Sequence, residues 1–173
     1  MVVMNVALIL RLVLPVLLSP LDSQLFNNLL LSVFKLFSNQ WRGIKGKYTI
    51  KALLLVVLQI LSSDFENQHN LNVNIIARLP ILALTAKLLG LREASPDVAV
   101  IGLRVIAALL ESEVFDPVIA EPMLLERMIS CMTSRSDEVA EAALVCIAQC
   151  LGTAEHTSVL VSKGVIDSVL TPY

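Results

Sequence analysis

The sequence SPDVAVIGLRVIAALL at residues 95–110 recurs in pattern further along the chain, as SDEVAEAALVCIAQCL at residues 136–151. The register extends further, because Ser95–Ile129 aligns with Ser136–Leu170 without a gap. Most apolar positions of one copy fall on apolar positions of the other, at the spacing of an amphipathic helix. A period of roughly 40 residues is typical of stacked helical units, each of which buries its apolar face against its neighbours.

Helix start and stop signals divide most of the chain into helices. Ser95 and Ser136 are favourable N-caps, Pro96 suits a first helical turn, and Gly152 is typical of the residue after a helix end. The helices predicted by these signals and by the apolar spacing are 22–37, 47–61, 73–77, 79–89, 96–110, 117–120, 122–133, 137–151, 156–162 and one that begins at 165. No alternating strand pattern appears, so we expect an all-α chain.

The repeat also predicts how the chain is organised. We expect a single domain with irregular N-terminal helices and a basic loop at 1–46, a degenerate repeat at 47–94, a repeat at 95–135 and a truncated repeat at 136–173. Terminal repeats normally present a polar outer face, and residues 169–173, VLTPY, offer none. We therefore expect an uncapped end, and a chain that is a segment or short form of a longer array.

The composition is rich in apolar residues and poor in charge. Hydrophobic residues make up 56% of the chain and charged residues 16%, below the level of about 25% that is ordinary for soluble domains. Too few polar side chains remain to cover every outward face, which predicts an exposed apolar surface that contacts a partner. The net charge of −2 divides into +5 over residues 1–51 and −7 over residues 52–173, so the two ends differ in surface potential.

Residues that perform catalytic or metal chemistry are sparse. Cys131, Cys146 and Cys150 form no C-x-x-C pair, and their apolar neighbours predict buried free thiols in a reducing, intracellular compartment, cytoplasmic or nuclear. His69 and His156 stand far apart without a local cluster of ligands, so no metal site is predicted. No phosphate-binding glycine loop, nucleophile elbow or paired catalytic carboxylates occur, so we expect no enzyme activity and no cofactor.

The repeats resemble the armadillo family. Residues 159–170, VLVSKGVIDSVL, are similar to the junction between the second and third helices of an armadillo repeat, and residues 142–151 resemble the family's long helix. The resemblance covers residues 95–173 and extends less regularly over 20–94, and HEAT repeats are the nearest related architecture. It implies a right-handed α-solenoid of about three to four helical repeats.

One departure from the family limits what the resemblance implies. Armadillo proteins that bind nuclear import signals present a tryptophan and, four residues later, an asparagine on the groove-lining helix. The matching pairs in this chain are Leu55 and Gln59, Arg104 and Ala108, and Val145 and Gln149. Because no pair has the tryptophan and asparagine, the resemblance does not imply binding of import signals.

The function implied by the resemblance is a non-enzymatic scaffold or adaptor, whose concave groove binds a protein or peptide partner. The polar residues expected on that groove are Lys87, Arg92, Glu126, Arg127, Ser130 and Thr133. Further repeats or another subunit are expected to pack on the apolar ends of the stack.

Two alternatives of other classes remain open. The first is a nucleic-acid-associated subunit, because basic side chains near aromatic ones suit phosphate contact and base stacking. The residues of that basic patch are Lys35, Trp41, Arg42, Lys45, Lys47 and Lys51. The second is a membrane-tethered helical protein that uses the apolar residues 1–18. We favour a packed helix there, because Arg11 would lie near the centre of a bilayer and Ser19-Pro20 makes a poor cleavage site.

Overall fold

The described part of the chain is helical. A computed structural model describes residues 28, 47–62, 73–74, 76–77, 81–90, 95–112, 116–152, 154–162 and 164. Every regular element within these residues is an α-helix, which confirms the predicted all-α class. The helices are α3 (Lys47–Leu61), α5 (Ile81–Leu89), α6 (Pro96–Leu110), α7 (Pro117–Ala120), α8 (Met123–Met132), α9 (Asp137–Cys150) and α10 (Ala154–Ser162).

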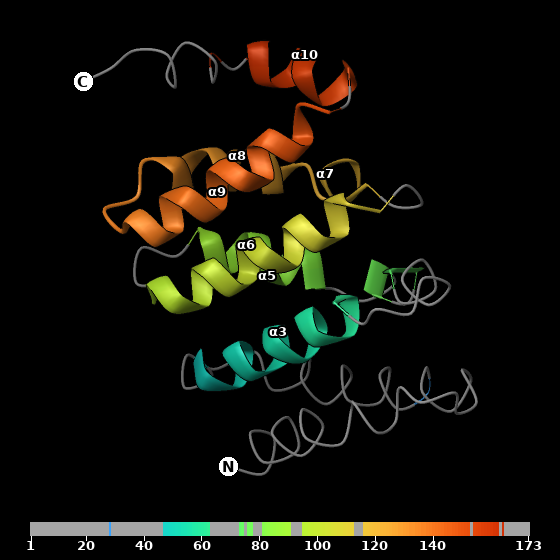
Figure 1. Cartoon of the computed structure of the whole chain (residues 1–173), viewed down its shortest axis with the longest axis vertical. Helices are drawn as coiled ribbons and strands as arrows, with labels where there is room; N and C mark the ends of the chain where they lie inside the picture. Colours follow the sequence, from blue (N-terminus) through green and yellow to red (C-terminus); the bar gives the residue numbers. More distant parts are fainter. Residues whose placement is uncertain are drawn as a thin grey trace.

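These helices lie in two rows along the long axis of the molecule (Figure 1). One row consists of α3, α6 and α9, and α6 packs against both of the others. The second row consists of α5 and α8, which pack against each other. The rows are joined because α5 contacts α6, α8 contacts α9, and the short α7 contacts both α6 and α8. At the C-terminal end of the stack, α10 follows α9 (Figure 1).

The spacing of helices within each row matches the repeat in the sequence. The start of α9 follows the start of α6 at the same offset that separates Ser136 from Ser95, and α8 follows α5 at almost the same offset. The offset from α3 to α6 is larger, because a longer connection separates α3 from α5 than α6 from α8. The repeat places Asp97 and Glu138 at equivalent positions of adjacent helices, and likewise Arg104 and Val145.

α6 is enclosed on most sides, because α3, α5 and α9 all pack against it. Nine of its residues are buried, as expected of a helix that is apolar nearly all round. Gly102 permits a close approach, since a Cβ there would lie 3.1 Å from Cγ2 of Thr85 on α5 and 3.8 Å from Cδ1 of Leu54 on α3. Thr85 is itself buried, and its hydroxyl donates a 2.8 Å hydrogen bond to the carbonyl of Ile81. The hydroxyl of Thr85 therefore has a hydrogen-bond partner although the side chain is buried.

The three cysteines belong to the core, as predicted. Cys131, Cys146 and Cys150 are free and buried. The Cys146 thiol donates a 3.2 Å hydrogen bond to the carbonyl of Leu103 across the interface between α6 and α9. Burial raises the pKa of Cys146 to about 12 and that of Cys150 to about 11, so both thiols are protonated at neutral pH.

Helix boundaries follow the predicted signals closely. α3 and α6 have the predicted bounds, and Ser95 and Ser136 are the N-caps of α6 and α9 in extended conformation. α10 begins at Ala154, slightly earlier than the predicted start at His156, and the turn predicted after it contains Gly164 at a φ of 68°. The predicted helix 22–37, except residue 28, and the helix expected to begin at 165 lie outside the described residues.

Candidate protein-interaction surfaces

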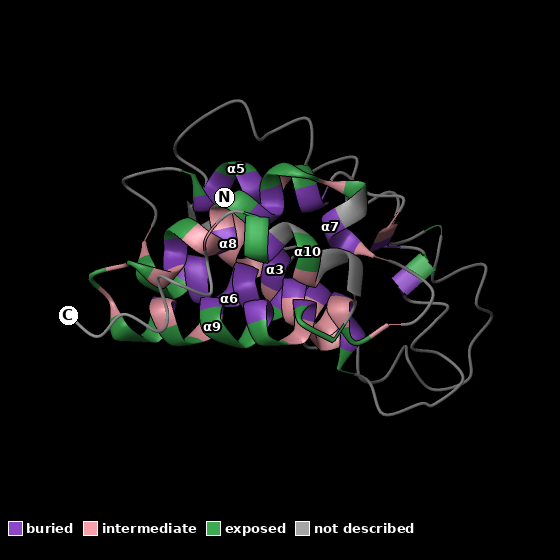
Figure 2. Cartoon of the chain, turned by 90° about the horizontal axis from the view of Figure 1, so that it is seen from above, coloured by how far each residue is buried: buried purple, intermediate pink, exposed green. Residues whose placement is uncertain are grey.

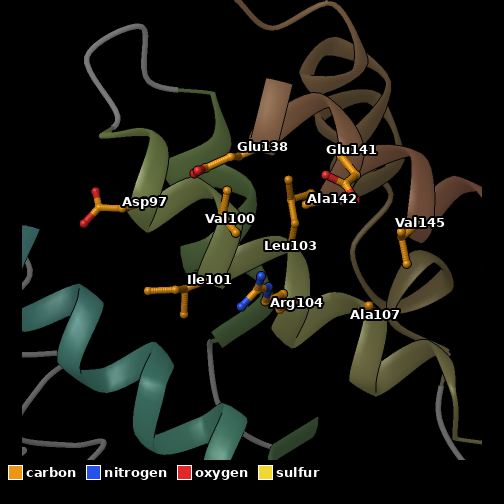
Figure 3. Close-up of a pocket in the computed structure, with 10 residues that line it drawn as sticks. All are labelled: Asp97, Val100, Ile101, Leu103, Arg104, Ala107, Glu138, Glu141, Ala142 and Val145. Carbon is orange, nitrogen blue, oxygen red and sulfur yellow. The ribbon is translucent and has the colours of Figure 1, made fainter. Parts of the chain in front are cut away.

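An open pocket of about 490 Å³ lies between α6 and α9. Its lining consists of Asp97, Val100, Ile101, Leu103, Arg104 and Ala107 from α6, and Glu138, Glu141, Ala142 and Val145 from α9 (Figure 3). On both helices the lining residues recur at intervals of three and four, so each helix presents one stripe to the pocket. Most of these side chains are apolar, and charged groups stand among them. We call this feature the α6–α9 pocket.

The charges of the α6–α9 pocket are predominantly acidic. Glu138 and Glu141 are exposed near the start of α9, and neither forms an ion pair with a described residue. Arg104 is exposed on α6 and lies across the pocket from them (Figure 3). Asp97 forms an ion pair with Lys51 of α3, and the hydroxyl of Ser95 donates a second hydrogen bond to its carboxylate. These two donors hold the pKa of Asp97 at about 2, below its ordinary 3.8.

Exposed apolar side chains lie on α9 and directly after its end. Leu144, Val145 and Leu151 have exposed fractions of 43%, 49% and 44%, respectively. Figure 2 shows the exposed residues of α9 along its outer side, away from the buried residues of α6. Exposed large apolar side chains gathered on one helix mark an interaction site more often than isolated ones do. The partner contact that the composition predicts for an exposed apolar surface stays a prediction.

A second pocket, of about 400 Å³, lies between α5 and α8. Its lining consists of Ala83, Ala86, Lys87, Gly90, Glu121, Met123 and Arg127. We call it the α5–α8 pocket. It brings together Lys87 and Arg127, two of the residues predicted for a groove, which are distant from each other in the sequence. The predicted groove residues therefore belong to the row of α5 and α8, whereas the larger α6–α9 pocket belongs to the other row.

The remaining predicted groove residues do not line either pocket. Glu126, Ser130 and Thr133 are exposed on α8 or at its end. The hydroxyl of Ser130 donates to the carbonyl of Glu126 at 2.9 Å, and that of Thr133 donates to the carbonyl of Ser130 at 3.1 Å. Both hydroxyls thus bond to the backbone of their own helix. Arg92 lies outside the described residues, so the predicted groove set stays a prediction as a whole.

The residues of the two alternative functions lie mostly outside the described part of the chain. In the basic patch, Lys35, Trp41, Arg42 and Lys45 are outside it, while Lys47 begins α3 and Lys51 is paired with Asp97. The apolar residues 1–18 are also outside it. Among the helices that are described, none is long and apolar enough to cross a bilayer.

Sequence reasoning missed the α6–α9 pocket. Among the described residues, no three His, Cys, Asp or Glu side chains come together in a way that could hold a metal ion. The missed signal was the spacing of Glu138, Glu141 and Val145, which places a mixed acidic and apolar stripe on one face of α9. The equivalent stripe of α6, one repeat earlier, contains Asp97 and Arg104.

Comparison of the chain with models of protein families, with curated proteins and with solved structures finds no match.

Proposed function

We propose that this protein is a non-enzymatic protein-interaction scaffold, built as a right-handed, armadillo-like α-solenoid. Two observations support the architecture: the helices stack in two rows, and the helices of adjacent units begin roughly 40 residues apart. We assign the concave, partner-binding side to the row of α3, α6 and α9. The observation that carries this assignment is the α6–α9 pocket, where equivalent stripes of two adjacent units form one continuous lining.

The ligand proposed for this pocket is an extended peptide segment of a partner protein. The apolar lining, including Val100, Ala142 and Val145, suits one or two aliphatic side chains. Glu138 and Glu141, which are exposed and without an ion-pair partner among the described residues, suit a lysine or arginine beside them. Because the pocket is open, a chain can lie across it.

Peptide selection tests this proposal. A library of random peptides displayed on phage is selected on the purified protein, and the enriched peptides are synthesised and their affinity measured by fluorescence anisotropy. We expect enriched sequences to combine a basic residue with neighbouring aliphatic ones. Val145→Arg places a long cation in the pocket from an exposed position, and it should weaken binding at least about tenfold.

The matched control for this experiment is Leu144→Arg. It adds the same side chain to the same helix at similar exposure, at the neighbouring position and outside the pocket lining. Peptides should bind this variant within about threefold of the wild type. Peptides that bind Val145→Arg as tightly as the wild type, or a selection that yields no binding peptide, would refute the proposal.

Two further parts of the proposal concern assembly and location. We propose that further repeats or another subunit pack on the ends of the stack, which is supported by the exposure of Val161 on α10, at 55%. A reducing intracellular compartment is supported by the three free, buried cysteines.

A further inference from the structure

In the α5–α8 pocket, the guanidinium of an arginine lies against a glycine. Gly90 follows the last residue of α5, and the guanidinium of Arg127 from α8 lies against it. A Cβ at Gly90 would lie 2.7 Å from Cζ and 2.8 Å from Nε of Arg127, closer than real contacts of this kind. Gly90 has no positive φ, so its role here is to leave space rather than to adopt a special backbone conformation.

Arg127 has unused donor capacity at this position. Its Nε is buried and has no hydrogen-bond partner among the described residues, and its guanidinium forms no ion pair with any of them. Buried N–H donors in proteins normally have an acceptor, and within the described part of the chain the Nε–H of Arg127 is an exception. Lys87, in the last turn of α5, lines the same pocket and is exposed. The negative end of the α5 dipole favours both cations there.

We propose that the α5–α8 pocket binds the carboxylate of an acidic residue in a protein partner, together with an adjacent apolar side chain. The planar fork formed by the two Nη groups of Arg127, rather than its enclosed Nε, matches the two oxygens of a carboxylate, and Lys87 supplies a second positive charge. Met123, with 50% of its surface exposed, lines the pocket beside them and offers an apolar wall. The volume of about 400 Å³ exceeds that of a lone carboxylate, which leaves room for the neighbouring side chain.

The charge of the lining favours a carboxylate over a phosphate group. Lys87 and Arg127 bring two positive charges and Glu121 brings one negative charge, so the lining has a net charge of +1. One carboxylate neutralises this charge, whereas a phosphate dianion would leave excess negative charge beside Glu121. This inference rests on the proposed function in one respect, that the ligand belongs to a protein. The pocket that binds it lies on the opposite row of helices.

Nuclear magnetic resonance with defined probes tests this inference. The ¹⁵N-labelled full chain is titrated with acetyl-Leu-Glu-Leu-amide, with the neutral acetyl-Leu-Gln-Leu-amide, and separately with inorganic phosphate. The readouts are the Arg127 Nε–H resonance, assigned by its absence from Arg127→Lys, and the backbone amide of Met123. We expect the Glu peptide to shift both resonances saturably, and to bind at least about tenfold more tightly than the Gln peptide.

Substitutions test whether peptide binding depends on the α5–α8 pocket rather than on other parts of the protein. Arg127→Lys keeps the charge but loses the fork, so it should weaken binding of the Glu peptide at least about tenfold, measured at the Met123 amide. Arg135→Lys, at an exposed arginine outside both pockets, should bind as the wild type does. Equal binding of the Glu and Gln peptides, no shift with either, or tighter binding of phosphate than of the Glu peptide would overturn the inference. Val145→Arg should retain Glu-peptide binding, which distinguishes failure of this site from failure of the α6–α9 pocket.

Discussion

The contact between Gly102 and Thr85 provides a quantitative test of how α5 and α6 pack. Replacing an interior helical glycine by alanine stabilises a helix by about 1 kcal/mol. At Gly102 the new methyl would lie 3.1 Å from Cγ2 of Thr85, and crowding of this kind in a packed core costs about 1–3 kcal/mol. We therefore expect Gly102→Ala to leave the free energy of unfolding unchanged or to lower it by up to about 2 kcal/mol.

Removing the opposing methyl should reverse this outcome. In Thr85→Ala, Cγ2 is absent, and the contact of 3.8 Å between the new methyl and Cδ1 of Leu54 is ordinary. Gly102→Ala in that background should then stabilise by about 1 kcal/mol, the helix propensity alone. The two substitutions should thus be coupled by about 1–3 kcal/mol in a double-mutant cycle.

Urea unfolding followed by far-ultraviolet circular dichroism measures each corner of the cycle. Ala148→Gly, at an exposed position of α9, calibrates the propensity difference in the same protein, at a cost of about 1 kcal/mol. If Gly102→Ala changes stability equally in both backgrounds, within about 0.5 kcal/mol, the close approach of α5 to α6 is wrong.

Two other predictions concern ionisable groups. The Asp97 carboxyl has a pKa of about 2 in the folded protein against 3.8 ordinarily, so the stability from its pair with Lys51 is complete above about pH 4 and is lost as the pH falls toward 2. Both side chains are exposed, so the pair contributes at most about 1 kcal/mol to stability. Asp97→Asn should remove this part of the pH dependence of stability, measured by urea unfolding. If the variant and the wild type had the same pH profile, the pairing would be contradicted. Cys146, with a pKa of about 12, should resist iodoacetamide in the native protein and react in urea, as followed by mass spectrometry. Native alkylation at the unfolded rate would exclude its burial.

Much of the fold could be predicted because local sequence determines it. Ser95 and Pro96 fix the start of α6 through backbone preferences that need no tertiary information. The burial of Cys146 followed from its apolar neighbours and its position in the repeat. α10 begins at Ala154 rather than at the predicted His156, and Thr153, whose residue type favours an N-cap, directly precedes this start in the sequence.

The candidate sites were harder to predict, because they depend on contacts between helices. Lys87 and Arg127 were chosen as exposed polar groups, but their convergence depends on the space that Gly90 leaves at the end of α5. The resemblance places Arg104 and Val145 on groove-lining helices, but it does not predict that their helices enclose the α6–α9 pocket. Periodicity shows which residues of a helix share a face, but it does not show which face of a stack is hollow.

The unlike side chains at equivalent positions of α6 and α9 have a consequence for the direction in which a ligand binds. Asp97 and Glu138 are both acidic, whereas Arg104 on α6 is replaced by Val145 on α9. A peptide lying across the pocket would meet a cation on one helix and an apolar side chain on the next, and reversing it would exchange these contacts. A peptide and its reversed sequence, although identical in composition, should therefore differ in affinity, since the surface distinguishes the polarity of the chain bound to it.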